Sequence, residues 1–477
     1  MNIELFVNGI QWVFLLYFIC LGTCYIALNI SSFVSVQRLN IRNEVAGMPP
    51  IYTEFMYPVS IIAAAYNEET TICDSVRALL QLKYTEFEII IVNDGSTDRT
   101  MEVLINSFGF ERVPEAYRHR IATRPIRGVY LSTEYPNLRL VDKQRGWKAD
   151  ASNAGINVAR FPLVCVTDAD SLLQRGSLQR LVQPFLDDPT TIAAGGTIRI
   201  ANGCKVSGGF VEHVELPRSP LALFQVVEYM RGFLFGRLGW SPINALLIIS
   251  GAFGVFHKES VIAAGGYCRH TVGEDMELVA RLHRQARLEQ KPYRIVFLPD
   301  PICWTEAPVH FKDLRQQRMR WQTGLADVLS MHKQLFFHPN SGTVGWIAFP
   351  FYLIFELIGP VIEVLGLCII ATAAWFGWID YGSLAIFVFL SVSVGTMLSA
   401  SALLLEESSF RVYRRFTDLL VLMTVALVEN LGYRQLTSIW WFVALIKWLS
   451  GSESRWDPVR RAGFGADIKT RIDVNKK

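Results

Sequence analysis

The sequence has few charged residues and almost no imbalance between them. Only 19% of its 477 residues are charged, and 46 Lys and Arg against 43 Asp and Glu give a formal net charge of +3. A nucleic-acid-binding surface needs a basic excess, so no nucleic-acid partner is expected. The eight cysteines form no CxxC pair and are interpreted as reduced, mostly buried thiols. HExxH is absent, and so is a Walker A pattern, which argues against an ATP-driven pump.

Hydrophobic residues make up 51% of the chain, and their long runs predict membrane segments. Residues 12–34 carry no charge, and this run exceeds the roughly 20 residues that a helix needs to cross a bilayer. No basic segment precedes the run, whereas Arg38 and Arg42 follow it, so a signal anchor is expected instead of a cleaved signal peptide. By the positive-inside rule the N-terminus lies outside, and the chain after residue 37 lies in the cytoplasm.

Four further apolar runs lie in the last third of the chain, at 345–372, 382–405, 419–432 and 436–449. Four crossings would return the basic C-terminal tail to the cytoplasm. The last two runs are short, so a re-entrant or interfacial hairpin is nearly as good an interpretation as two spans. Three acidic residues within the runs either pair with basic residues that lock helices together or line a pore: Glu356, Glu363 and Glu429.

The chain is therefore expected to be a multi-pass protein of the cytoplasmic (inner) membrane with four parts. These are an anchor helix at 1–37, a cytoplasmic domain at 38–335, membrane or interfacial helices at 336–450 and a basic tail at 451–477.

The middle of the chain alternates strand and helix patterns. The runs at 58–65 and 87–92 are apolar and β-branched, as in strands buried in a parallel sheet, and both end in polar turns. Ligands bind at such strand ends in doubly wound sheets. Gly95 allows a sharp turn that leaves Asp94 able to accept a hydrogen bond from a nucleobase. Asp98 is interpreted as a helix cap.

A third strand at 162–167 runs directly into Asp168 and Asp170. Two carboxylates this close repel each other unless a cation joins them. Oxygen ligands suit Mg²⁺ or Mn²⁺, which keep open positions for substrate phosphates. A lone DxD is more often a loop, but its place after a buried strand favours a metal site.

Seven short motifs follow one another in this part of the chain. They are AAAYNEE at 63–69, VNDGSTD at 92–98, GWKADASNAG at 146–155, TDAD at 167–170, SGAFG at 250–254, GED at 273–275 and QRMRW at 317–321. Together they resemble the processive, inverting family-2 glycosyltransferases, the group that includes cellulose, chitin, hyaluronan and poly-N-acetylglucosamine synthases. The resemblance implies an α/β GT-A (Rossmann-like) cytoplasmic domain, inserted between an N-terminal transmembrane helix and a C-terminal α-helical membrane region.

The resemblance also implies roles on the donor side. Glu68 and Asp94 would contact the base and ribose of a UDP-sugar, and Lys148 would lie beside its diphosphate. Asp168 would bind the nucleotide-sugar and share a metal with Asp170, which would be the direct ligand. The ion would be Mg²⁺ or Mn²⁺. Asn153, in the motif of Lys148, is interpreted as support for its loop.

On the acceptor side, Asp275 stands where the family has a TED or ED motif and would deprotonate the acceptor hydroxyl. Gln317, Arg320 and Trp321 share one side of a helix. Arg320 would stabilise the leaving diphosphate, while Gln317 and Trp321 would bind the acceptor. Without this motif Trp321 would be interpreted as an interfacial anchor.

Two other assignments complete the acceptor side. Gly251 would let the acceptor pass close to the backbone, although glycine in a strand can simply permit tight packing. Arg315 and Arg318 are interpreted as a membrane-surface patch.

The expected activity is that of a membrane-embedded, metal-dependent inverting hexosyltransferase that extends a β-linked polysaccharide, coupled to export. Its partners would be a UDP-sugar, with UDP-N-acetylglucosamine or UDP-glucose favoured, the nascent polysaccharide and membrane lipid, and an accessory subunit remains open. One alternative is a non-processive enzyme that uses a lipid-linked acceptor. Another, a catalytically silent transporter or sensor, is disfavoured by the intact acidic motifs.

Overall fold

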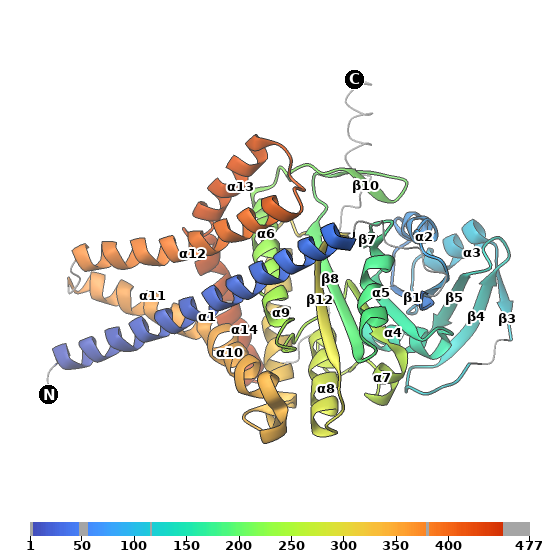
Figure 1. The fold of residues 1–477 in the computed structure, drawn as a ribbon, viewed down its shortest axis with the longest axis horizontal. Coiled ribbons are helices and arrows are strands. Elements are labelled where there is room, and N and C mark those ends of the chain that lie inside the picture. Colours follow the sequence, from blue (N-terminus) through green and yellow to red (C-terminus); the bar gives the residue numbers. More distant parts are fainter. Residues whose placement is uncertain (1–2, 47–55, 115–116, 378–380, 452–477) are drawn as a thin grey trace.

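The computed structural model describes residues 3–46, 56–114, 117–377 and 381–451, so the basic tail expected at 451–477 lies outside the described residues apart from residue 451. Figure 1 shows two parts, an α/β part on the right and a set of long helices on the left. Two helices join them, because α6 (Pro220–Met230) packs on the sheet and on the membrane-region helices, and α9 (Phe311–Met331) packs against α8 and α14.

The α/β part is built on one ten-stranded sheet in the order β3-β4-β5-β2-β1-β6-β11-β8-β12-β7. Its strands are β1 (Val59–Ala65), β2 (Phe87–Asn93), β3 (Phe110–Val113), β4 (Ile126–Ser132), β5 (Leu138–Lys143), β6 (Leu163–Asp168), β7 (Leu172–Leu173), β8 (Thr191–Ile200), β11 (Phe253–His257) and β12 (Arg294–Thr305). A separate hairpin pairs β9 (Lys205–Ser207) with β10 (Phe210–His213).

The centre of the sheet is parallel, as the apolar runs predict. β1 pairs in parallel with β2 and β6, and β2 pairs in parallel with β5. These strands are buried on both faces, which explains their continuous apolar sequences. Outside this centre, β11 runs antiparallel between β6 and β8. The sheet is therefore mixed, as in many large α/β folds.

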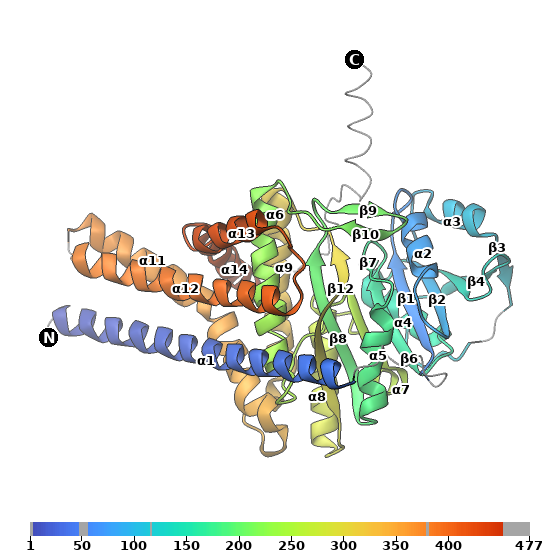
Figure 2. The ribbon, with the colours of Figure 1, turned by 45° about the horizontal axis from the view of Figure 1, so that its top comes forward.

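Helices cover this sheet and extend from it (Figure 2). α4 packs on β1 and β2, and α5 packs on β8, β11 and β12. The helices of the α/β part are α2 (Ile72–Leu80), α3 (Thr100–Phe108), α4 (Trp147–Val158), α5 (Ser177–Asp187), α7 (Lys258–Ala263) and α8 (Glu274–Leu288). Those outside it are α1 (Ile3–Ala46), α10 (Phe349–Phe351), α11 (Gly359–Trp375), α12 (Tyr381–Ser409), α13 (Phe416–Val428) and α14 (Tyr433–Leu449).

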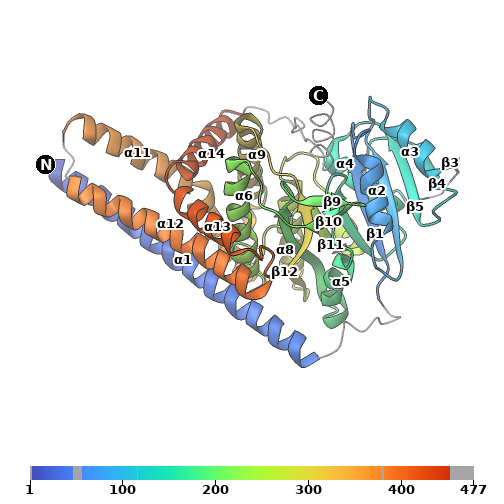
Figure 3. The same cartoon turned by 90° about the horizontal axis from the view of Figure 1, so that it is seen from above.

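Two helical stretches of the described chain are long and apolar enough to cross a membrane, Phe14–Leu39 and Val344–Trp375. α13 and α14 meet at a bend of 53° and would form one broken span or a re-entrant pair. This agrees with the re-entrant interpretation of these short runs, whereas neither helix alone qualifies as one of two separate spans. The run at 382–405 forms α12, which lies along α1 in Figures 2 and 3 but does not meet the same criteria.

The acidic residues of the apolar runs contact neighbouring helices. Glu429 is fully buried, and it accepts from Arg231 and Ser399 at 2.5 Å each. Glu356 accepts from the Tyr25 hydroxyl at 2.8 Å, and Glu363 accepts from Ser438. Glu429 therefore pairs with a basic residue, as the first of the two interpretations predicts. Glu356 and Glu363 are instead bound by hydroxyl groups.

Candidate functional site

The register of the central strands brings polar residues to one edge of the sheet. Ala65 of β1 lies opposite Asn93 of β2, and Ala64 lies opposite Asp168 of β6. The carboxyl ends of these parallel strands therefore meet, as they do where doubly wound sheets bind ligands. This edge carries the first, second and fourth motifs of the sequence.

Residues from four separate segments converge next to this edge. The Lys148 ammonium group at the start of α4 forms an ion pair with Asp168 and donates to the Gly251 carbonyl at 2.9 Å. The Gly251 N–H donates to Asp275 Oδ2 at 2.9 Å, and Glu274 Oε1 lies 4.0 Å from Lys148 Nζ. The structure therefore joins Lys148, Asp168, Gly251 and Asp275, which lie far apart in the sequence.

The charges of this cluster depend on one another. Burial alone would lower the pKa of Lys148, but the carboxylates of Asp168 and Glu274 outweigh it and raise that pKa. Burial raises the pKa of Glu274, the Lys148 ammonium opposes that rise, and the charge of Asp275 adds to it. Arg320 also lies close enough to favour the charged form of Glu274. The sequence analysis did not single out Glu274, although it stands beside Asp275 in GED.

Asp168 and Asp170 are the residues that could hold a metal. They lie at and just after the end of β6, and Asp170 is 8% exposed. Their carboxylate oxygens suit a hard divalent cation, and the ammonium group against Asp168 shows that a positive charge fits there. Within the described residues no three His, Cys, Asp or Glu side chains gather around one point that could hold a metal.

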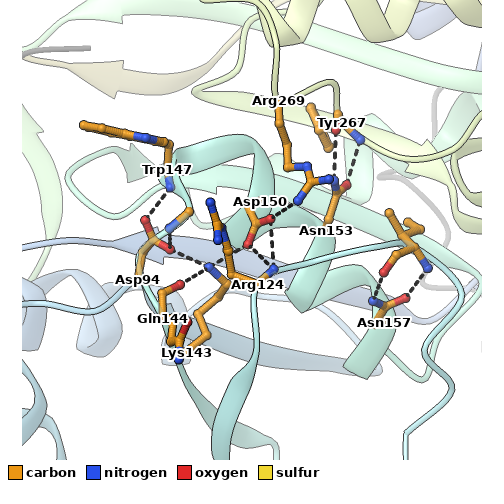
Figure 4. A network of polar contacts seen from close by, with 12 residues as sticks. Asp94, Arg124, Lys143, Gln144, Trp147, Asp150, Asn153, Asn157, Tyr267 and Arg269 are labelled. Carbon is orange, nitrogen blue, oxygen red and sulfur yellow. Dashed lines mark hydrogen bonds and ion pairs between the residues drawn. The ribbon is translucent and has the colours of Figure 1, made fainter. Parts of the chain in front are cut away.

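Asp94 lies in a buried polar network (Figure 4). The network borders residues 144–146, the loop before Lys148, which we call the donor loop. It is 4% exposed, and it accepts from Lys143 Nζ at 2.6 Å and from the N–H groups of Gly146 and Trp147 at 2.9 and 2.7 Å. Lys143 also pairs with Asp150 at 2.7 Å. Burial raises the pKa of Asp94 and Lys143 opposes that rise. A contact between Asp94 and a nucleotide remains a prediction.

This network fixes the start of α4. Trp147 has a φ of +70°, a conformation that costs a residue with a side chain about 1–2 kcal/mol. The bond from its N–H to Asp94 holds it there, and the next residue is Lys148. Gly95 has a φ of +68°, and a Cβ on it would lie 2.8 Å from the backbone nitrogen of Arg145. The sharp turn predicted at Gly95 is thus confirmed.

The neighbouring strand ends are tied together by short polar contacts. Glu68 accepts from the Thr71 hydroxyl at 2.7 Å, and its N–H donates to Thr100 at 2.8 Å. Asp98 accepts from the Thr100 N–H at 3.0 Å and from the Glu69 N–H at 3.2 Å. Asp98 therefore binds the first residue of α3, although the residue at the cap position is Arg99 and not Asp98 as predicted. Glu68 is half-buried beside it.

The QRMRW residues lie on α9, which connects the site to the membrane helices. Trp321 is 41% exposed, and its ring lies 6.3 Å from that of Tyr229. The expectation that Arg318 belongs to a membrane-surface patch is wrong, because this residue is fully buried and pairs with Glu228 at 2.6 Å. Its guanidinium carbon lies 4.3 Å from the Trp321 ring centroid. Gln317 accepts from Arg318 at 3.3 Å.

Arg237 is a second residue that sequence reasoning missed. It follows α6, outside every motif, and its guanidinium carbon lies 3.7 Å from the ring centroid of Phe233. Nη1 is buried and has no hydrogen-bond partner in the described part of the chain. Burial lowers the pKa of Arg237 to about 10, and the nearby Asp275 carboxylate opposes that shift. A half-buried cation with one buried, open donor thus lies near Asp275.

Comparisons with known proteins agree with this geometry. The family model described as "Glycosyl transferase family group 2" matches residues 163–446, and the model described as "Glycosyl transferase family 2" matches residues 60–119. A solved mannosyltransferase from Pyrobaculum calidifontis, in complex with GDP-Man and Mn²⁺, aligns with a TM-score of 0.50 and 20% identity over 86% of this chain and 99% of that one. This likeness concerns the fold, and the chain has the GT-A type of mixed α/β sheet.

Curated relatives include poly-beta-1,6-N-acetyl-D-glucosamine synthases. That of Staphylococcus aureus (strain COL) is 29% identical over 61% of this chain and 60% of its own length, and that of Staphylococcus epidermidis is 28% identical over 57% and 55%. The chain thus matches less than two thirds of these relatives. The family description nevertheless covers more than half of the chain. The protein therefore belongs to glycosyl transferase family group 2 and is a family-2 glycosyltransferase.

Proposed function

We propose that this glycosyltransferase transfers sugar from a UDP-sugar to the end of a growing β-linked polysaccharide, with inversion at the anomeric carbon. The observation that carries the proposal is the cluster of Lys148, Asp168, Gly251 and Asp275. It unites a cation, two carboxylates and a glycine at the ligand-binding edge of the sheet. The likeness to poly-N-acetylglucosamine synthases supports a polysaccharide product.

On the donor side, Lys148 and Arg320 bind the diphosphate and stabilise its charge as the bond to the sugar breaks. Lys148 suits this role because its ammonium group stays protonated between carboxylates. Glu68 contacts the base or ribose. Asp94 acts partly through the loop, since its bonds to Gly146 and Trp147 orient the residue that precedes Lys148.

On the acceptor side, Asp275 takes the proton of the attacking hydroxyl. The hydroxyl oxygen forms the new bond to the anomeric carbon, while the bond from that carbon to the diphosphate oxygen breaks and its electron pair leaves with the diphosphate. Asp275 already accepts from the N–H groups of Gly251 and Met276, which fix its orientation, and a carboxylate has lone pairs left for the hydroxyl proton. One displacement converts an α-linked donor into a β-linked product.

Asp168 and Asp170 would hold a divalent cation, Mg²⁺ or Mn²⁺. When bound, such an ion would neutralise charge on the leaving diphosphate. Both ions bind proteins through a few carboxylates and share their other positions with phosphates, which agrees with the small number of acidic ligands at this edge.

The proposal that the enzyme extends a polymer is supported by the position of the proposed acceptor-binding residues next to the membrane helices. Trp321 offers an exposed ring on α9, the helix that also carries Gln317. α9 packs directly against α14 of the membrane region. We therefore propose an anchor at 1–37, a cytoplasmic catalytic domain at 38–335, membrane helices at 336–450 and a tail at 451–477, with the polymer leaving through the membrane helices.

The test is incorporation of radiolabelled sugar by membrane vesicles that contain the full chain. Each UDP-sugar, beginning with UDP-N-acetylglucosamine and UDP-glucose, is supplied with Mg²⁺ or Mn²⁺ and then with EDTA. A long product insoluble in organic solvent, lost with EDTA, supports the proposal. A short solvent-extractable product would replace it with transfer to a lipid-linked acceptor. Inactivity with every donor, also after co-expression of neighbouring genes, would refute it.

A further inference from the structure

An open groove of about 340 Å³ lies beside the loop that precedes α8. Its walls come from residues 121–122, Asn153 of α4, residues 265 and 267–270, α8, and residues 331–332 at the end of α9. This volume falls in the range of small-molecule sites, about 300–1,000 Å³. The groove is lined by three arginines and two histidines against a single carboxylate: Arg269, Arg281, Arg284, His270, His332 and Glu277.

The carboxylate of the groove is already neutralised. Glu277 is 1% exposed and accepts from Arg281 at 2.6 Å and from His332 at 3.1 Å. Arg281 also donates to the carbonyls of Ala264 and Gly266, at 2.6 Å each, while its Nε is buried without a hydrogen-bond partner among the described residues. The charges of Glu277 and Arg281 therefore cancel one another.

Two arginines of the groove remain in excess. Arg284 is half-buried, and among the described residues it forms no ion pair or hydrogen bond. Arg269 forms one ion pair, with Asp150 at 3.0 Å, and its side chain is 39% exposed. A planar guanidinium group presents five donors, and its fork matches the oxygens of a phosphate. The groove contains two such guanidinium groups, and its one carboxylate is already paired, so it favours an anionic ligand.

Arg269 also connects the groove to the donor loop (Figure 4). Its partner Asp150 pairs with Lys143 at 2.7 Å, and Lys143 pairs with Asp94 at 2.6 Å. Asp94 in turn holds the N–H of Trp147, next to Lys148. Each link is a direct contact, and the three middle groups, Asp150, Lys143 and Asp94, are buried, so a change at Arg269 alters the charge balance that positions Lys148.

We propose that this groove binds a small phosphorylated anion through Arg284 and Arg269, and that its binding weakens donor binding through the chain Arg269–Asp150–Lys143–Asp94. An anion that draws Arg269 away leaves Asp150 with one cation fewer. Asp150 then competes harder with Asp94 for Lys143, which loosens the support of Trp147. The second half of this proposal rests on the proposed function, because it assumes that the donor is a UDP-sugar bound near Lys148.

The groove is separate from the proposed catalytic cluster. Arg284 lies nine residues after Asp275 on α8, which corresponds to about 13 Å along a helix. It touches none of the groups assigned to catalysis, so its replacement leaves basal transfer unchanged. This separation makes the two sites distinguishable by mutation.

The first experiment measures binding of inorganic pyrophosphate to the detergent-solubilised full chain by calorimetry, with EDTA present. We expect R284Q to raise the Kd about tenfold or more, as loss of one charged contact does. K148M, which removes the cation of the donor site, should leave binding in place. The matched control is R180Q, which removes an exposed arginine paired with Asp300 outside the groove.

The second experiment measures UDP affinity with and without saturating pyrophosphate. We expect a loss of about fivefold or more in the wild type, within the usual range of coupling between sites, and no loss in R269Q.

Pyrophosphate binding that is absent, or that disappears in K148M and persists in R284Q, would overturn the groove as an anion site and leave the proposed function standing. Unchanged UDP affinity would overturn the coupling. UDP that fails to bind at all would count against the proposed function and the coupling, whereas the pyrophosphate result would still decide the groove.

Discussion

The ammonium group of Lys143 holds two buried carboxylates together, and replacing this lysine with methionine tests whether the network supports the donor loop. Lys143 and Asp150 are fully buried and the Asp94 side chain is 6% exposed. Removing one partner of a buried ion pair costs about 3–5 kcal/mol. A domain of 150–250 residues loses about 2–4 °C in Tm for each kcal/mol, so K143M should melt about 6–20 °C below the wild type.

The loss should depend on pH in a defined direction. Burial raises the pKa of Asp94, and Lys143 is the first group that opposes this rise. Without Lys143 the folded chain binds a proton more readily than the unfolded chain, so stability is lost as pH rises through the folded pKa and regained on acidification. The defect in Tm should therefore shrink as the pH is lowered through the raised pKa of Asp94.

Thermal unfolding of the detergent-solubilised full chain, followed by tryptophan fluorescence, measures both effects. K205M is the matched control, because Lys205 is 64% exposed and forms a surface pair with Glu215. Such a pair contributes about 0–1 kcal/mol. A K143M protein that melts with K205M, or that shows the same defect at every pH, would refute the role of the buried charge.

Three further predictions concern the reaction. D275N should lower transfer by about 10²–10⁴-fold while UDP binding changes little, since the base acts on the acceptor; normal turnover would remove Asp275 from the mechanism. W321A should lower polymer yield far more than hydrolysis of the donor, because stacking positions the acceptor, and W321F should recover part of the yield; an equal loss of both activities would point to a donor role. R237M should reduce transfer about tenfold or more without lowering the Tm, because a buried donor without a partner costs stability and is retained for function; a fall in Tm would make Arg237 a structural residue.

Much of the fold could be predicted because local patterns determine it. The continuous apolar runs of β1, β2 and β6 identify buried strands, and the polar residues that follow them identify the ligand edge. The turn at Gly95 could be predicted because glycine readily adopts the positive φ that a sharp turn requires. These features depend on neighbours within a few residues, which is why one sequence was enough.

The missed features depend on partners that are distant in the chain. Arg318 carries the same charge as Arg315, but it is buried because Glu228 on α6 faces it. Lys143 sits at the end of a strand with nothing local to mark it, and its role comes from Asp94 and Asp150. The antiparallel β11 was missed for the same reason, since strand direction is set by the crossover and not by composition.

A contact between residues distant in the chain can be tested at Gly251, because its two backbone groups bind the proposed donor lysine and the proposed catalytic base. Its carbonyl accepts from Lys148, and its N–H donates to Asp275. A Cβ on Gly251 would lie 2.9 Å from Lys148 Nζ and 3.4 Å from the Asp275 side chain. The closest atom is the end of a flexible side chain, so alanine here should displace the ammonium group and leave the fold intact.

We therefore expect G251A to weaken UDP binding and transfer about tenfold, while its Tm stays within about 2–4 °C of the wild type, the equivalent of 1 kcal/mol. G232A is the matched control, because a Cβ there meets nothing within 4 Å, and it should match the wild type in both measurements. If G251A binds UDP normally, the contact between Gly251 and Lys148 does not position the donor lysine. If it melts far below G232A, Gly251 serves packing, and its proximity to Lys148 and Asp275 would then be incidental to the chemistry.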